Sequence, residues 1–265
     1  MKTVLITGAS SGLGRATAEY LSSKGFDVIG TSRNPQKVET SIELIKLDVS
    51  DESSVEKAVT DFIEKKGKID VLVNNAGYGL SGPIEETSLA EAKAQLDVNF
   101  FGAVLMTQAV LPHMRANNGG IIINISSIGG LTGMPFQAFY SASKFALEGF
   151  TEALRIEMRS SDIQVVNINP GDYKTSCTQN RIIVKGLTDT YREQFEKVLS
   201  IYEHDEQNGS DPKQVALLVE RLIRKGKGYK VRYLTGSLFQ KIAIRSKKIL
   251  SSKLFERVVV AVYKQ

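Results

Sequence analysis

The sequence is short of several features that would place the protein outside the cell or across a membrane. Its 265 residues include a single cysteine, Cys177, so no internal disulfide can form. The chain opens on an apolar stretch suited to a strand, residues 2–7, rather than on a signal peptide, and no uninterrupted apolar run reaches the length of a membrane span. These absences predict a cytoplasmic protein.

Excess positive charge is missing from most of the chain. The net charge is +5, but residues 236–265 contain seven Lys or Arg and one Glu, a net of +6, which leaves 5 − 6 = −1 for residues 1–235. No basic patch with interleaved aromatic residues occurs in residues 1–235, so nucleic acid is not an expected partner. The only two histidines, His113 and His204, are interpreted as structural, and no metal site is predicted.

What the chain does contain is a regular alternation of strands and helices. The composition, 42% hydrophobic and 24% charged, is ordinary for a globular protein, and no repeat or low-complexity linker divides it. This pattern predicts an α/β fold: a Rossmann-like doubly wound parallel sheet of about seven strands with helices on both faces. We expect a single domain with a C-terminal helical extension.

A glycine-rich turn follows the first predicted strand and precedes a helix at about residues 15–24 and a strand at residues 26–31. Glycines let the backbone approach a pyrophosphate, and a helix N-terminus offers N–H groups and the positive end of a dipole. The spacing is G-x-x-x-G-x-G. The turn predicts a dinucleotide site that includes Gly8, Ser10, Ser11, Gly12, Leu13 and Gly14.

The end of the second predicted strand lacks the acidic residue that would hold the ribose hydroxyls of NAD. Ser32 and Arg33 stand there instead, and a guanidinium can bind a 2′-phosphate that a carboxylate would repel. The sequence therefore predicts NADP as the cofactor, although Arg33 could also be a solvated loop residue. Asp48 and Val49 end a third strand, residues 42–47, where Asp48 can accept from the adenine amino group.

Candidate catalytic groups occur between residues 121 and 154. Ser127 follows an apolar strand, at the strand end where open α/β sheets place their ligands. Tyr140 and Lys144 are spaced i and i+4 at the start of a helix, so they share one face, and an ammonium beside a phenol favours the phenolate. These groups predict a proton-transfer site, although a lone Tyr-x-x-x-Lys also occurs on ordinary helix surfaces.

Other segments border the same predicted crevice. Residues 88–117 indicate one or two long helices, and Asn99 within them is either a satisfied core residue or a bridge to a water that relays protons to Lys144. Residues 164–169 and 229–234 are predicted strands. Residues 176–210 are polar and irregular, which is typical of a substrate lid.

Five motifs together resemble the short-chain dehydrogenase/reductase family. They are Thr7–Gly14, Asn74–Gly77, Asn99, the pair of Ser127 thirteen residues before Tyr140-x-x-x-Lys144, and Pro170-Gly171 with Thr175. The resemblance implies a catalytic tetrad of Asn99, Ser127, Tyr140 and Lys144. It also implies cofactor contacts from Asn75, Ala76, Gly77, Tyr140, Lys144, Pro170, Gly171, Tyr173 and Thr175.

Residues 129–136 and 140–149 are similar to the 17-beta-hydroxysteroid and retinol dehydrogenase branch of that family. This resemblance implies an NADP(H)-dependent oxidoreductase that interconverts a ketone and a secondary alcohol on an apolar steroid-, retinoid- or lipid-like substrate, with Tyr140 as acid/base. The alternatives are a 3-oxoacyl or 3-ketosphinganine-type reductase and a non-catalytic NADP-sensing protein. The family also implies a homodimer or homotetramer.

The basic C-terminal segment, residues 236–265, is set apart from a dinucleotide-binding catalytic domain at residues 1–235. A helical projection from Leu238 places Leu238, Phe239, Ile242, Ala243, Ile249 and Leu250 on one side and Lys241, Arg245, Lys247 and Lys248 on the other, with Ile244 as the exception. Such a helix can lie on an anionic membrane surface. Alternatively, it packs on the protein body or on a neighbouring subunit.

Overall fold

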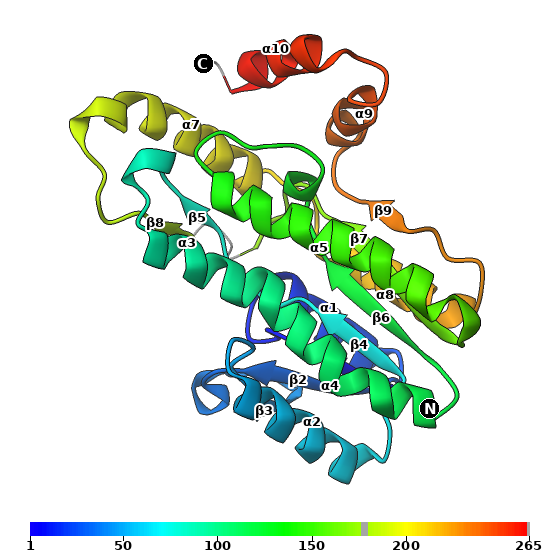
Figure 1. Cartoon of the computed structure of the whole chain (residues 1–265). Helices are drawn as coiled ribbons and strands as arrows, with labels where there is room; N and C mark the ends of the chain where they lie inside the picture. The colour runs from blue at the N-terminus through cyan, green and yellow to red at the C-terminus, as the bar shows by residue number, and fades with distance from the viewer. Residues whose placement is uncertain (176–179, 264–265) are drawn as a thin grey trace.

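The computed structural model describes residues 1–175 and 180–263 and is built around one parallel sheet (Figure 1). The strand order is β3-β2-β1-β4-β6-β7-β9, and every neighbouring pair is parallel. The strands are β1 Thr3–Ile6, β2 Asp27–Ser32, β3 Glu43–Lys46, β4 Val71–Asn74, β6 Gly120–Ile125, β7 Ile163–Asn169 and β9 Arg232–Leu234. The predicted doubly wound sheet of seven strands is confirmed, with its switch point between β1 and β4.

Helices cover both faces of this sheet (Figure 1). On one face are α1 Gly12–Ser23 and α8 Lys213–Lys225, and on the other are α2 Glu52–Lys66, α4 Gly102–Ala116 and α5 Ala138–Glu157. The further helices are α3 Leu89–Leu96, α7 Asp189–Gln207, α9 Leu238–Ser246 and α10 Ser252–Val262. Two predicted ends were wrong by three residues: α1 begins at Gly12 rather than at residue 15, and β9 begins at Arg232 rather than at residue 229.

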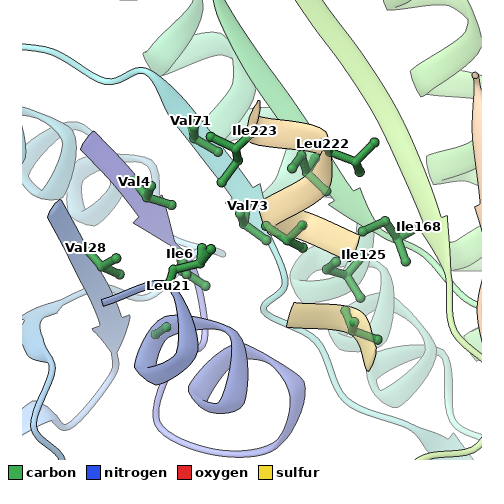
Figure 2. Packing of buried hydrophobic residues seen from close by; sticks show 14 of the residues in the cluster. Val4, Ile6, Leu21, Val28, Val71, Val73, Ile125, Ile168, Leu222 and Ile223 are labelled. Atoms are coloured by element: carbon green, nitrogen blue, oxygen red, sulfur yellow. The ribbon is translucent and has the colours of Figure 1, made fainter. Parts of the chain in front are cut away.

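Alternation of side chains along the strands explains why the predicted strands are apolar throughout. Val4 and Ile6 of β1 face the cluster formed with Leu21 of α1 and Ile223 of α8 (Figure 2). Leu5, between them, belongs to the cluster on the opposite face, with α2, α4 and α5. A strand covered on both faces needs an apolar residue at every position, because neither side meets water.

The segment predicted as one or two long helices is continuous helix from Leu89 to Ala116, 28 residues that by length and composition alone could cross a membrane. Uninterrupted apolar runs, on which the sequence prediction rested, did not identify this segment as long and apolar enough to cross a membrane. In the fold, Met106, Val110 and Met114 are fully buried in the core beneath the helix. Between α3 and α4 the helix widens into a π-helical turn, Asp97–Phe101.

The prediction of irregular structure was wrong for the described part of residues 176–210, while the role of this segment as a substrate lid stays a prediction. Residues 176–179 lie outside the described residues. A short strand, β8 Ile182–Ile183, pairs with β5 Leu80–Ser81, and the 19-residue helix α7 follows. Phe195, Val198 and Tyr202 are buried along α7. The many charged residues of α7 obscured this sparse apolar stripe.

The basic C-terminal segment forms two helices, α9 and α10, rather than one (Figure 1). Ser237 and Ser251 cap the two helices, so the chain breaks and restarts between them. Ile244, the exception in the helical projection, is the buried residue of α9, whereas Leu238 and Phe239 are 71% and 64% exposed. The final residues of the segment, 264–265, lie outside the described residues.

Candidate active site

A cleft of about 800 Å³ runs along the carboxyl ends of the strands. Nearly all of the predicted cofactor residues line it: Gly8, Ser10, Ser11, Gly12, Leu13, Ser32, Arg33, Asp48, Val49, Asn75, Ala76, Gly77, Tyr140, Lys144, Pro170, Gly171, Tyr173 and Thr175. Ser127 lines it as well. Gly14 and Asn99 are absent from its lining and act from behind it.

The glycine-rich turn has the backbone that a dinucleotide site needs. Gly8 and Gly12 have φ angles of 65° and 57°, in the left-handed region that glycine tolerates. A Cβ on Gly14 would lie 2.3 Å from the side-chain nitrogen of Asn75, so Gly14 allows close packing rather than contact with a ligand. That Asn75 amide donates to the carbonyls of Thr7 (2.9 Å) and Gly8 (3.1 Å) and holds the turn against the end of β4.

The end of β2 presents two cations to the cleft. Arg33 lines it as predicted, and Lys37, on a 3-10 turn at Pro35–Lys37, lines it as well. Neither side chain has an ion-pair partner in the part of the chain that the structure describes. The sequence pattern did not predict Lys37, because its place in the cleft beside Arg33 depends on the 3-10 turn between them.

Ser127 and Tyr140 approach each other across Gly129. A Cβ on Gly129 would lie 3.1 Å from Tyr140 Cε1 and 3.4 Å from Ser127 Oγ. Ser127 Oγ already accepts the Gly129 N–H at 3.0 Å, which leaves its own proton free to point elsewhere. The strand end of β6 and the first turn of α5 therefore bring a hydroxyl and a phenol to the same small space.

Lys144 lies one helical turn after Tyr140 and is buried. Its Nζ donates to the carbonyl of Ile125 at 2.9 Å and lies 5.9 Å from the centroid of the Tyr140 ring. A Cβ on Gly77 would be 3.7 Å from this Nζ and 3.0 Å from Asn99 Oδ1, so Lys144 and Asn99 flank one glycine. The ammonium is thus fixed close to the phenol.

Asn99 lies on the π-helical turn, and protein groups engage its amide. Its Oδ1 accepts the Tyr78 N–H at 3.0 Å, and its Nδ2 donates to the Tyr78 carbonyl at 2.9 Å and to Ser143 Oγ at 3.3 Å. Of the two alternatives left by the sequence, these contacts match the satisfied core residue. π-helical turns frequently occur at functional sites.

A buried polar row that sequence reasoning did not predict supports the site from inside the sheet. Asn74 donates to Asn124 at 2.9 Å, Asn124 donates to Thr151 of α5 at 2.8 Å, and Thr151 donates to Asn167 at 2.8 Å. Each asparagine is a polar residue next to apolar positions of its strand, which was the available signal. The row ties β4, β6 and β7 to the helix that carries Tyr140 and Lys144.

The far end of the cleft contains polar residues that were also missed. Asp172, Arg181, Tyr202 and Glu206 line it, and Gln240 of α9 donates to the Asp172 carboxylate. Gln240 is 68 residues from Asp172 in the chain. The C-terminal segment therefore contacts a residue of the cleft wall, which no local sequence pattern could indicate.

The doubly wound sheet, the glycine-rich turn and the hydroxyl–phenol–ammonium group together define a nucleotide-dependent oxidoreductase that acts on alcohol or keto groups. The short chain dehydrogenase family profile matches residues 2–183. The chain belongs to the short-chain dehydrogenase/reductase family, and the resemblance inferred from its motifs is confirmed.

Two relatives of known name are similar over much of the chain. A 3-ketodihydrosphingosine reductase of Bacteroides thetaiotaomicron is 42% identical over 255 residues, which cover 96% of this chain and 94% of that protein. Human retinol dehydrogenase 8 is 42% identical over 188 residues, which cover 66% of this chain and 60% of that protein.

Solved structures share the fold. A short-chain dehydrogenase from Streptomyces avermitilis superposes with a TM-score of 0.81 at 30% identity, covering 97% of this chain and 96% of that one. A 3-ketoacyl-(acyl-carrier-protein) reductase from Brucella melitensis, complexed with NADH, gives 0.73 at 27% identity, with 88% and 95% coverage. A serine dehydrogenase complexed with NADP+ gives 0.75 at 26% identity, with 89% and 95% coverage.

Proposed function

We propose that the protein reduces the ketone of a long-chain keto-lipid, of the 3-ketosphinganine type, with NADPH. The observation that carries the chemistry is the convergence of Ser127, Tyr140 and Lys144 beside the glycine-rich turn. The 42% identity to a 3-ketodihydrosphingosine reductase over nearly the whole of both chains supports the keto-lipid. Similarity to retinol dehydrogenase 8 covers a smaller share of the chain, which makes retinoid and steroid substrates the second choice.

The residues of the turn, together with Arg33, would hold the nucleotide, which supplies a hydride to the carbonyl carbon when bound. Ser127 donates a hydrogen bond from its hydroxyl to the carbonyl oxygen, keeps its own proton and positions the ketone. Tyr140 transfers its phenolic proton to the same oxygen as negative charge develops there. Lys144 stabilises the resulting phenolate through its nearby positive charge. Asn99 keeps the backbone at Tyr78 in place beside Lys144.

The substrate is tested directly by following NADPH oxidation with matched sets of steroid, retinoid, 3-oxoacyl and long-chain keto-lipid ketones. We expect the highest kcat/KM with the keto-lipids. Higher kcat/KM with a steroid or a retinoid would contradict the proposed substrate while leaving the reaction class intact.

NADP is proposed over NAD because Arg33 and Lys37 both line the nucleotide end of the cleft. Ser32 also occupies the position of the acidic residue that would hold the ribose hydroxyls of NAD. Arg33→Ala is expected to weaken NADPH binding about ten- to a hundredfold, since a charge-assisted hydrogen bond is lost, and to change NADH binding little. Titration calorimetry with both nucleotides measures this. Equal losses for NADPH and NADH would contradict the assignment of Arg33 to the 2′-phosphate.

The C-terminal helices are proposed to contact an anionic membrane that holds the substrate. Leu238, Phe239 and Ile242 share one exposed side of α9, where they are 71%, 64% and 56% exposed, and Lys241 and Arg245 stand beside them. Apolar side chains flanked by cations suit a surface of anionic headgroups. Because Gln240 of the same helix contacts Asp172, this surface adjoins the cleft.

Replacing Leu238, Phe239 and Ile242 together by Ser is expected to abolish co-sedimentation of the full chain with anionic liposomes at low salt. The matched control is Leu89→Ser, a residue 69% exposed on α3. Wild type should sediment with anionic liposomes and remain in the supernatant with neutral ones. If wild type stays in the supernatant with both, the two helices have a purely structural role.

Association of copies through α4 and α5 stays a prediction from the family. Phe101, Phe145 and Ile156 are exposed on or beside these helices, which supports such an interface. Sedimentation velocity of the full chain distinguishes a monomer from the expected dimer or tetramer.

A further inference from the structure

Asp172 is held at the substrate end of the cleft, close to the catalytic serine. It lies two residues after Pro170, whose carbonyl accepts the N–H of Ile128, the residue after Ser127, at 2.9 Å. Its own carbonyl accepts the N–H of Ser210 at 2.9 Å, and its carboxylate accepts from Gln240 of α9. The backbone and side chain of Asp172 are therefore fixed in the wall that Ser127 and Tyr140 also line.

The carboxylate of Asp172 lies among negative charges without a cation of its own. No Lys or Arg within the described ranges forms an ion pair with it, because Arg181 pairs with Glu206. Burial, together with the charges of Asp205 and Glu206, raises the pKa of Asp172 to about 6, against the Gln240 hydrogen bond and the charge of Arg181. Near neutral pH the group is an ionised carboxylate that a bound cation would stabilise.

Arg181 provides an independent sign of a ligand at the same place. Its side chain is only 5% exposed, its Nη2 donates to Glu206, and its guanidinium lies 5.5 Å from the centroid of the Tyr202 ring. Its Nη1 has no hydrogen-bond acceptor among the residues that the structure describes. A buried N–H of a permanently charged group is costly unless an acceptor reaches it, and Arg181 lines the cleft.

The two observations specify different parts of one headgroup. A carboxylate in need of a cation selects an ammonium, and a guanidinium N–H in need of an acceptor selects a hydroxyl oxygen. A simple 3-oxoacyl chain, a steroid ketone or a retinoid carries no ammonium and would leave Asp172 desolvated and unpaired.

We propose that Asp172 binds a protonated amino group on the carbon next to the substrate carbonyl, while Arg181 donates from Nη1 to a hydroxyl oxygen of the same headgroup. The substrate class is therefore the long-chain amino ketone that also carries a hydroxyl group. This inference rests on the proposed reduction of a long-chain keto-lipid and adds the residues that select among such lipids.

The test compares two ketones with the full-length enzyme and NADPH: 3-ketodihydrosphingosine and the same chain with hydrogen in place of the amino group. Asp172→Asn keeps the shape of the side chain and an acceptor for Gln240 but removes the charge. We expect the ratio of kcat/KM for the amino ketone to that for the plain ketone to fall about ten- to a hundredfold in Asp172→Asn. Asp205→Asn, an exposed neighbour outside the cleft lining, is the matched control and should keep the wild-type ratio.

The outcomes separate the subsite from the function. Reduction of both ketones with an unchanged ratio in Asp172→Asn overturns the subsite and leaves the keto-lipid reductase standing. Failure of wild type to reduce either ketone, with turnover of a steroid or a retinoid, overturns both.

A measurement on wild type covers the case in which Asp172→Asn does not fold. The same kcat/KM ratio is expected to fall about tenfold per pH unit below about pH 6, because the Asp172 carboxylate becomes protonated there. Glu206, Asp205, Tyr202 and Tyr263 also face this region, and burial holds the two phenols neutral by raising the pKa of each. Both ketones use the same proton transfer from Tyr140, so any effect of pH on that step cancels in the ratio. A ratio that is flat between pH 5 and 7 overturns the assignment to Asp172.

Discussion

Replacing Tyr140 with Phe is expected to remove most turnover, by about 10²–10⁴-fold in kcat, while NADPH binding stays nearly unchanged. The phenyl ring retains the packing of the tyrosine against Gly129, so the loss is that of the transferable proton. Lys144 then has no phenolate to stabilise. Steady-state kinetics with the best keto-lipid substrate measures the loss.

Binding is measured separately, so that a defect in folding is not mistaken for a defect in chemistry. The chain contains no tryptophan, so enhancement of nucleotide fluorescence or calorimetry is the suitable readout. If Tyr140→Phe retained more than about a tenth of the wild-type rate with normal NADPH binding, another group would have to be the acid.

Removing the hydroxyl of Ser127 is expected to lower kcat by about 10²–10³-fold, the usual loss when one donor to a developing oxyanion is deleted. Ser127→Ala also removes the acceptor of the Gly129 N–H, so a change in the turn contributes to the loss. Ser127→Thr separates the two effects, since it restores a hydroxyl. Partial recovery of kcat in Ser127→Thr is expected.

Ser126→Ala is the matched control, because the two serines are neighbours at the end of β6. Ser126 Oγ is buried without a hydrogen-bond partner in the described part of the chain, and a Cβ on Gly130, not on Gly129, would meet it at 2.7 Å. Its removal leaves no partner unsatisfied and should change kcat about threefold or less. A larger loss in Ser126→Ala than in Ser127→Ala would reverse the assignment of the two serines.

The placement of the candidate catalytic residues could be predicted because their geometry is local. Tyr140 and Lys144 share a helix face by their spacing alone, and the end of a parallel strand places Ser127 at the ligand edge of the sheet. Buried parallel strands require continuous apolar runs, so the parallel sheet could be predicted from this pattern, whereas the order of its strands comes from the structure. The glycine-rich turn followed for a similar reason, since it joins adjacent elements.

The C-terminal segment shows what a local sequence pattern cannot predict. The amphipathic projection identified the apolar side of α9, but Leu238 and Phe239 are exposed and Ile244 is buried. A helical period says which residues share a face, and it does not say which face meets the protein. The polar composition of α7 likewise concealed a helix whose buried residues are few.

By itself, the sequence determined the apolar strands of a parallel α/β fold, the dinucleotide turn and the spacing of Tyr140 and Lys144 on one helix face, because each depends on residues within a few positions of one another. Only the tertiary structure decided that Gln240 meets Asp172 and that Arg181 meets Glu206 in the cleft wall. Those contacts join segments 68 and 25 residues apart. Each contact joins a helix, α9 or α7, to a residue outside it, Asp172 after β7 or Arg181 before β8, and no spacing along the chain encodes where such distant segments will meet.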